Sequence, residues 1–170
     1  YCKFLNESYY ANKTGYTTTT SRQRHEFRFA ELVLNYAEAM NEAFGPDAVP
    51  SGYAMSVRQA LQQVRDRASV NLPAVTAADK DSFREAVKHE RRIELAFEDH
   101  RYWDLLRWKD AMEVLNRPVL GVKIARNGEE WSYEVTEVAT RTFHERNYYL
   151  PFLRSEIENS NNTLEQNPQY

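Results

Sequence analysis

Apolar residues recur at helical spacing through the first part of this chain. One stretch predicts a helix from about Gln23 to Phe44, and Gly45 followed by Pro46 ends it, as a glycine after the last turn and a proline beyond it commonly do. The positions predicted to face a core are Phe27, Ala30, Leu34, Ala37 and Phe44. A second stretch, from about Tyr53 to Ser69, predicts another helix with apolar positions Val57, Leu61, Val64 and Ala68. Together the two helices have the length of one helical-repeat unit.

A third helix is predicted after the next connector, where Asp79 or Ser82 can serve as its N-cap. We expect Asp99 to end it in a tight corner with a left-handed backbone, because aspartate tolerates that conformation better than most residues with a Cβ. A short fourth helix then runs to about Leu115.

Acidic residues interrupt the apolar face of the third helix. At 100° per residue, Phe83, Val87 and Phe97 share one narrow stripe. Glu90 and Glu94 fall on the same stripe. Burying a carboxylate without a partner is costly, so both acids are predicted to be buried against arginines in a structural charge cluster. The expected partners are Arg101, Arg65 and Arg67.

Between Pro118 and Arg146 the chain becomes richer in Val, Ile, Tyr and Thr. Asn127-Gly128 lies between two β-like runs, Val119–Ala125 and Trp131–Val135. This dipeptide accepts the positive φ angles of a type I′ turn, so the segment 118–146 is predicted to contain a β-hairpin.

The two ends of the chain carry weaker patterns. Residues 1–22 are rich in Tyr and Thr and are interpreted as an extended segment and a polar loop, with Cys2 as an ordinary strand cysteine. Ser155 with Glu158 matches a capping box for a last short helix. The predicted fold is therefore mostly α, with helix pairs, irregular loops and a small β-hairpin.

Composition narrows the classes of function. The chain has 170 residues, enough for one domain with a real core. Its net charge of −3, with both signs mixed, lacks the basic surface that nucleic-acid binding requires. No apolar run approaches the length of a transmembrane helix. A single cysteine cannot form an internal disulfide.

Side chains that could carry catalysis or a metal fail on spacing. Both His-Glu pairs, His25-Glu26 and His89-Glu90, lack the second histidine of a zincin motif. Glu90 and Glu94 lie one turn apart on one helix, whereas glycosidase acid–base pairs face each other across a cleft. We therefore expect no metal, no cofactor and no catalytic residue.

Aromatic residues are the remaining candidates for ligand contact, because Trp and Tyr rings can stack on sugar faces. Those expected to be buried in the core or to pack the helix corner are Phe27, Phe44, Phe83, Phe97, Trp103 and Trp108. Trp131 and Tyr133, beside the predicted turn, are the best candidates for exposed glycan contact. Three tyrosines of the opening loop come next, namely Tyr9, Tyr10 and Tyr16.

The run ERRIELAFEDHRYWDLLRW, from Glu90 to Trp108, closely resembles the C-terminal signature of the SusD/RagB family. Other stretches agree with that family in order and spacing. They are FAE through NYAEA in the first helix, LQQVRDRA in the second, and YLP, SEI and QNP near the end. The resemblance covers roughly residues 1–115 and 145–170. Departures are small: Asp99 stands where the corner usually carries Gly, Phe152-Leu153 replaces a Pro-containing stretch, and Gln169 replaces the terminal Gly.

The resemblance implies tetratricopeptide-like helix pairs and residues 1–170 as a C-terminal domain of a longer chain, with 118–146 as an insert. It also implies a non-catalytic outer-membrane lipoprotein that captures oligosaccharides or other nutrients as the lid of a SusC-like TonB-dependent transporter. Its lipid anchor would lie outside this chain, at the outward-facing surface. Two alternatives remain open, a helical-repeat scaffold that binds only protein and a carboxylate-based glycan hydrolase.

Overall fold

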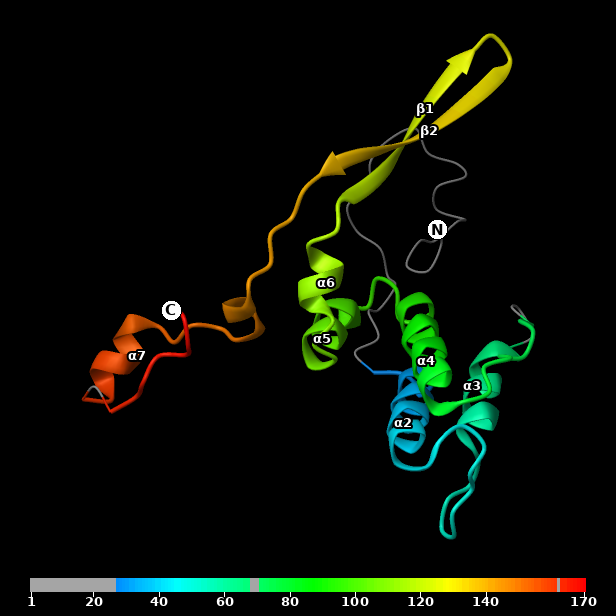
Figure 1. Cartoon of the computed structure of the whole chain (residues 1–170), viewed down its shortest axis with the longest axis horizontal. Coiled ribbons are helices and arrows are strands. Elements are labelled where there is room, and N and C mark those ends of the chain that lie inside the picture. Colours follow the sequence, from blue (N-terminus) through cyan, green and yellow to red (C-terminus); the bar gives the residue numbers. More distant parts are fainter. Residues whose placement is uncertain (1–26, 68–70, 162) are drawn as a thin grey trace, which may run out of the picture. The chain divides into compact units, whose positions relative to one another are not determined.

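The computed structural model describes residues 27–67, 71–161 and 163–170. The predicted extended segment at 1–22, with Cys2 and the three tyrosines of its loop, lies outside these ranges. The described residues belong to two compact units that divide between Glu94 and Leu95. Each unit buries apolar side chains of its own. Figure 1 labels the elements of both.

Within the described residues of the first unit lie three helices: α2 (Phe29–Phe44), α3 (Val57–Arg65) and α4 (Lys80–Glu94). Helix α2 packs against both α3 and α4 (Figure 1). Their buried apolar side chains are Val33, Leu34, Ala37, Met40, Val57, Ala60, Leu61, Val64, Phe83 and Val87. The face of each helix that was predicted from the apolar spacing is therefore the face that is buried. Complete burial of Phe83 alone stabilises the unit by about 2–3 kcal/mol.

Local polar groups fix where these helices begin and end. Gly45 ends α2 with a φ of 82°, as predicted from its place before proline. Ser56 and Gln59 form a reciprocal capping box at the start of α3. At the start of α4, Asp79 accepts hydrogen bonds from the backbone N–H groups of Asp81 and Ser82, which confirms Asp79 as the cap.

One arginine of α3 closes two loops of the first unit. The Arg58 guanidinium donates to both carboxylate oxygens of Asp47, at 2.7 and 3.0 Å. It also donates to the carbonyl oxygens of Val75 and Ala77. Its Cζ lies 5.0 Å from the centre of the Phe83 ring. Arg58 therefore holds the loops before α3 and before α4 over the same buried ring.

The second unit begins at the helix corner and contains α5 (His100–Arg107) and α6 (Ala111–Leu115). Asp99 has the predicted left-handed conformation, with φ 64° and ψ 8°. The single fourth helix predicted to run to Leu115 is wrong, because Lys109 takes a φ of 61° and breaks it. The backbone N–H of Asp110 bonds Leu105 O and that of Lys109 bonds Leu106 O, which is a Schellman ending without glycine.

The core of the second unit gathers around three buried residues. Leu105, Ala111 and Phe143 are buried, and the half-buried Leu106, Val114, Leu115 and Tyr148 pack against them. The Tyr148 hydroxyl donates to Lys109 O, at 2.9 Å, and accepts from the Met112 N–H. These two hydrogen bonds of Tyr148 stabilise the turn between α5 and α6.

The predicted hairpin is present as β1 (Val119–Asn127) and β2 (Glu130–Ala139), two antiparallel strands. Its turn differs from the prediction, since Asn127 pairs with Glu130 and the two turn residues are Gly128 and Glu129. Of these only Gly128 has a positive φ, 64°, which is the pattern of a type II′ rather than a type I′ turn. The strands run further than predicted, by Arg126 and Asn127 on β1 and by Glu130 and residues 136–139 on β2.

Three phenylalanines assigned to the core are exposed. Phe27 precedes the start of α2, and Phe44 ends that helix with its ring packed edge-on against Tyr53, 5.6 Å away. Phe97 is 72% exposed, because α4 ends at Glu94 and the helical spacing no longer applies there. Leu95 is buried in its place. Of the four, only Phe83 confirms the prediction.

The last helix, α7 (Arg154–Asn159), follows a 3₁₀ turn at Glu145–Tyr148. The predicted capping box is wrong: Leu153 is the N-cap residue, Ser155 lies inside the helix, and Glu158 pairs with Arg154. The chain beyond it folds back. The Gln166 amide exchanges two hydrogen bonds with the backbone of Phe152, at 2.8 and 2.9 Å.

Gly121 of β1 offers a test of the hairpin. A Cβ at this position would lie 2.7 Å from Cγ1 of Val138, a β-branched side chain with little freedom to rotate. Gly121→Ala is expected to destabilise the hairpin by about 1–3 kcal/mol, the usual cost of overpacking. Hydrogen exchange of the hairpin amides measures the loss. Adding Val138→Ala should restore most of the protection, and failure to do so would contradict the steric explanation.

A second test concerns the ion pair between α2 and α4. Both oxygens of Glu42 accept from Arg84, at 2.5 and 2.7 Å, and these hydrogen bonds lower the pKa of the Glu42 carboxyl. A lowered pKa in the folded state adds stability above the ordinary carboxyl pKa, and this is lost as pH falls through the lowered value.

Because the pair is nearly half exposed, Glu42→Gln should cost less than about 1 kcal/mol at neutral pH. In denaturant unfolding, the difference from wild type should disappear in acid. Glu85→Gln, at an exposed glutamate that pairs with Lys88 within α4, is the matched control and should show a smaller effect. A Glu42→Gln penalty that persists in acid would exclude the carboxylate as its source.

Candidate functional site

The acidic stripe of α4 forms a buried charge cluster with arginines from outside that helix. Arg65 of α3 donates to Glu90 Oε2, and Arg67 donates to Glu94 through two nitrogens, at 2.8 and 2.5 Å. Both glutamates are buried. The predicted burial of these acids and their pairing with Arg65 and Arg67 are confirmed. Arg101 belongs to the second unit, and its membership of the cluster stays a prediction.

Arg28 is a partner that sequence reasoning missed. It donates from Nη1 to Glu94 Oε1, at 2.6 Å, and from Nη2 to the Glu94 carbonyl oxygen, at 2.5 Å. The predicted helix from Gln23 placed Arg28 inside it, whereas Arg28 precedes α2 with an extended backbone, and only its charge could have drawn attention to it. The Glu94 carboxylate therefore binds the guanidinium groups of Arg28 and Arg67. The backbone carbonyl of Glu94 also accepts a hydrogen bond from Arg28. This arrangement supports a role in joining the helices rather than in proton transfer.

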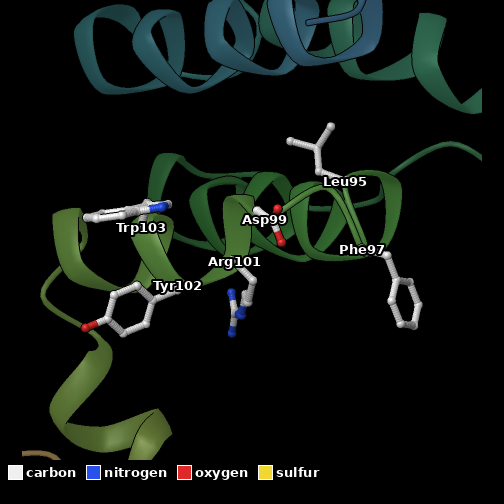
Figure 2. A pocket seen from close by; sticks show the side chains of 6 residues that line it. All are labelled: Leu95, Phe97, Asp99, Arg101, Tyr102 and Trp103. Carbon is white, nitrogen blue, oxygen red and sulfur yellow. The ribbon is translucent and has the colours of Figure 1, made fainter. Parts of the chain in front are cut away.

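In the second unit, the turn that leads into α5 carries a hollow of about 430 Å³ (Figure 2). Its lining residues are Leu95, Phe97, Asp99, Arg101, Tyr102 and Trp103. Figure 2 shows Phe97 on one side and the Tyr102 and Trp103 rings on the other. Those two rings meet edge-on with centres 5.5 Å apart. Trp103 is exposed, so the expectation that it packs inside the corner is wrong; Trp108 is half-buried.

The two residues predicted to contact glycan lie together on the hairpin. Trp131 and Tyr133 are two positions apart on β2, so their side chains project from the same face. Both are exposed. Arg126, directly across the ladder from Trp131, holds its guanidinium 5.4 Å from the indole centre and donates to Gly128 O. The exposure expected of both aromatics is thus observed, and glycan contact stays a prediction.

Residues 27–67, 71–161 and 163–170 contain neither a candidate metal cluster nor a helix that could span a membrane. In that part of the chain, no three His, Cys, Asp or Glu residues gather closely enough to hold a metal ion. Within the same ranges, none of the helices is both long and apolar enough to span a bilayer.

The sequence and the fold place the chain in a known family. A model of the SusD family matches residues 1–170, and the chain belongs to that family. This confirms the resemblance drawn from the motifs. The predicted fold class, mostly α with a small β-hairpin, is confirmed as well.

Relatives of known sequence and structure agree with this assignment. The SusD-like proteins P38 and P25 of Formosa agariphila are 34% and 36% identical over 56% of this chain, and 19% and 17% of their own lengths. A SusD-like protein from Bacteroides fragilis superposes with a TM-score of 0.70 at 35% identity, over 85% of this chain and 25% of that one. A SusD-like carbohydrate binding protein of the same organism gives 0.57 at 34% identity, over 76% and 26%. The chain thus spans about a fifth of the curated relatives.

Glu94 provides the test of the charge cluster. Removing one partner of a buried, hydrogen-bonded ion pair leaves the opposite charge without compensation, so Glu94→Ala should cost about 3–5 kcal/mol. Denaturant unfolding of the whole protein measures this loss. Glu85→Ala, on the exposed side of the same helix, is the control and should change stability by less than about 1 kcal/mol. Equal effects of the two substitutions would show that the cluster does not stabilise the fold.

Proposed function

We propose that this chain forms part of a non-catalytic protein that captures oligosaccharides or related nutrients at the cell surface. Membership of the SusD family is the observation that carries the proposal. In this proposal, the protein works as the lid and partner of a SusC-like TonB-dependent transporter. A lipid anchor would hold it at the outward-facing side of the outer membrane, and residues 1–170 would form its C-terminal part.

The structure supports this division of labour between a frame and a contact surface. The helices of the first unit are joined through a buried core and through ion pairs of Glu90 and Glu94. The hairpin within 118–146 instead presents its aromatic side chains to solvent. Trp131 and Tyr133 are the proposed glycan contacts, because rings on one strand face can stack on successive sugars. A structural relative, which superposes with a TM-score of 0.57, is named as carbohydrate binding.

A scaffold that binds only protein is the second candidate. The observation in its favour is that the hairpin exposes aliphatic as well as aromatic side chains, since Val122, Ile124 and Val135 are also exposed. Titration with a panel of oligosaccharides separates the two, because a scaffold of this kind takes up none of them. Product formation from any glycan would instead favour the hydrolase.

The glycan contact is tested at Trp131 in the whole protein. Trp131→Ala should lower affinity for the cognate oligosaccharide about tenfold, the loss expected when one aromatic contact of about 1.4 kcal/mol is removed. Thermal stability should stay nearly unchanged, because the ring is exposed. Calorimetric titration and thermal unfolding measure the two effects.

Trp103 is a matched control for this experiment, since it is the same residue type with similar exposure, 58% against 55%, but outside the hairpin. Trp103→Ala should leave glycan affinity as in the wild type. Unchanged affinity in Trp131→Ala, with measurable binding by the wild-type protein, would remove the hairpin from the glycan site.

A further inference from the structure

One face of the hairpin carries a continuous row of apolar side chains. Residues paired across an antiparallel ladder project to the same side, and the side alternates along each strand. The register therefore places six apolar side chains on the face of Trp131, each more than half exposed. This apolar face consists of Leu120, Val122, Ile124, Trp131, Tyr133 and Val135. The opposite face carries Lys123 paired with Glu134, and Ser132 paired with Ala125.

Glycan contact accounts for only part of this surface. Sugars stack on the rings of Trp131 and Tyr133, whereas branched aliphatic side chains offer them no such platform. Val122 and Val135 face each other across the ladder, and Ile124 faces Tyr133. A two-stranded hairpin is also marginally stable unless its apolar face is covered. A protein surface therefore fits this face better than a carbohydrate alone.

Two charges flank the apolar face at opposite corners. Arg126 lies on β1 beside the turn and is paired with Trp131, whereas Glu137 lies on β2 at the open end and is paired with Leu120. Six residues of strand separate the two ends, roughly 20 Å, so these side chains cannot pair within one hairpin. Their placement is self-complementary: a second copy turned end to end brings the acid of one hairpin to the base of the other.

We infer that the apolar face binds the same face of a second copy of this chain. In a face-to-face pair related by a twofold axis perpendicular to the strands, β1 lies antiparallel over β1 of the other copy. Arg126 then lies over Leu120 of the second hairpin, next to Glu137, and symmetry forms this ion pair twice. A twofold axis along the strands would instead bring arginine near arginine and glutamate near glutamate. Charge therefore selects the end-to-end arrangement.

The area of the apolar face limits the affinity of the dimer. Covering six partly exposed apolar side chains on each copy buries on the order of 1,000 Å² in total, the lower limit of specific protein interfaces. The dimer is accordingly weak and depends on concentration. It also competes with the proposed glycan contact, since Trp131 and Tyr133 lie inside the interface. The inference goes beyond the proposed function and stands without it.

Sedimentation analysis of the whole protein over a wide range of concentration, without glycan, tests the pair. The wild type is expected to dimerise, and Arg126→Glu or Glu137→Arg alone should weaken the dimer about tenfold or more. The double reversal, Arg126→Glu with Glu137→Arg, restores the charge pairing and should return dimerisation close to wild type. Mixing the two single variants should also produce a heterodimer, because each then offers the charge the other lacks.

The opposite face supplies matched controls. Lys123→Glu and Glu134→Lys reverse the same kinds of charge on the same strands, away from the apolar face, and should leave the dimer unchanged. A protein that stays monomeric at every concentration overturns the inference, as does equal sensitivity to reversals on the two faces.

Added oligosaccharide separates this inference from the proposed function. A dimer that dissociates as glycan binds supports both. Dimerisation unaffected by a glycan that binds elsewhere keeps the dimer and removes Trp131 from the glycan site. Glycan binding to a protein that never dimerises leaves the proposed function in place and overturns the dimer.

Discussion

The pairing of Glu94 with two arginines is the interaction on which the first unit depends. Glu94 is the last residue of α4, and it binds Arg67 beyond α3 and Arg28 ahead of α2. The three helices are thereby joined at one point by one carboxylate. Apolar packing alone is non-directional and leaves helices free to slide, whereas a bidentate guanidinium–carboxylate pair sets the helix positions along their axes. The chain turns shortly after this residue, because α4 ends at Glu94.

The turn after α4 contains residues with left-handed backbone conformations, although none of them is glycine. Phe97 and Asp99 both take left-handed conformations within three residues, and Lys109 does the same at the end of α5. Left-handed backbone is costly for residues with a Cβ, so other contacts must hold it. For Lys109 these contacts are visible, since its carbonyl accepts from Tyr148 and its ammonium group lies 4.2 Å from that ring. Tertiary contacts therefore override the local preference of the chain.

These causes explain which features could be predicted from the sequence. The helix cores at Leu34, Leu61 and Phe83, the caps at Gly45 and Asp79, and the buried acids follow from local periodicity and charge, and they were predicted. The break at Lys109 and the exposure of Phe97 depend on contacts between distant residues, which no local pattern contains. The hairpin was predicted, but its turn was placed one residue early, because Asn-Gly and Gly-Glu compete for the same corner and register decides between them. On the hairpin, the exposure of Trp131 and Tyr133 was predicted from the sequence. The exposed aliphatic side chains beside them were not predicted, although Val122 and Ile124 alternate with other residues along β1.

The aliphatic neighbours change how the hairpin should be understood. A surface evolved only for sugars needs rings and polar groups, and alternation with valine and isoleucine adds nothing to it. A surface that must be covered by protein needs this continuous apolar row, with charges at its rim to choose the partner and its orientation. The hairpin combines both features, since its rings and its aliphatic side chains share one face. Two occupants of one face exclude each other, so binding of either weakens binding of the other by the same factor. In the inferred dimer, access of the proposed glycan to Trp131 would therefore depend on protein concentration.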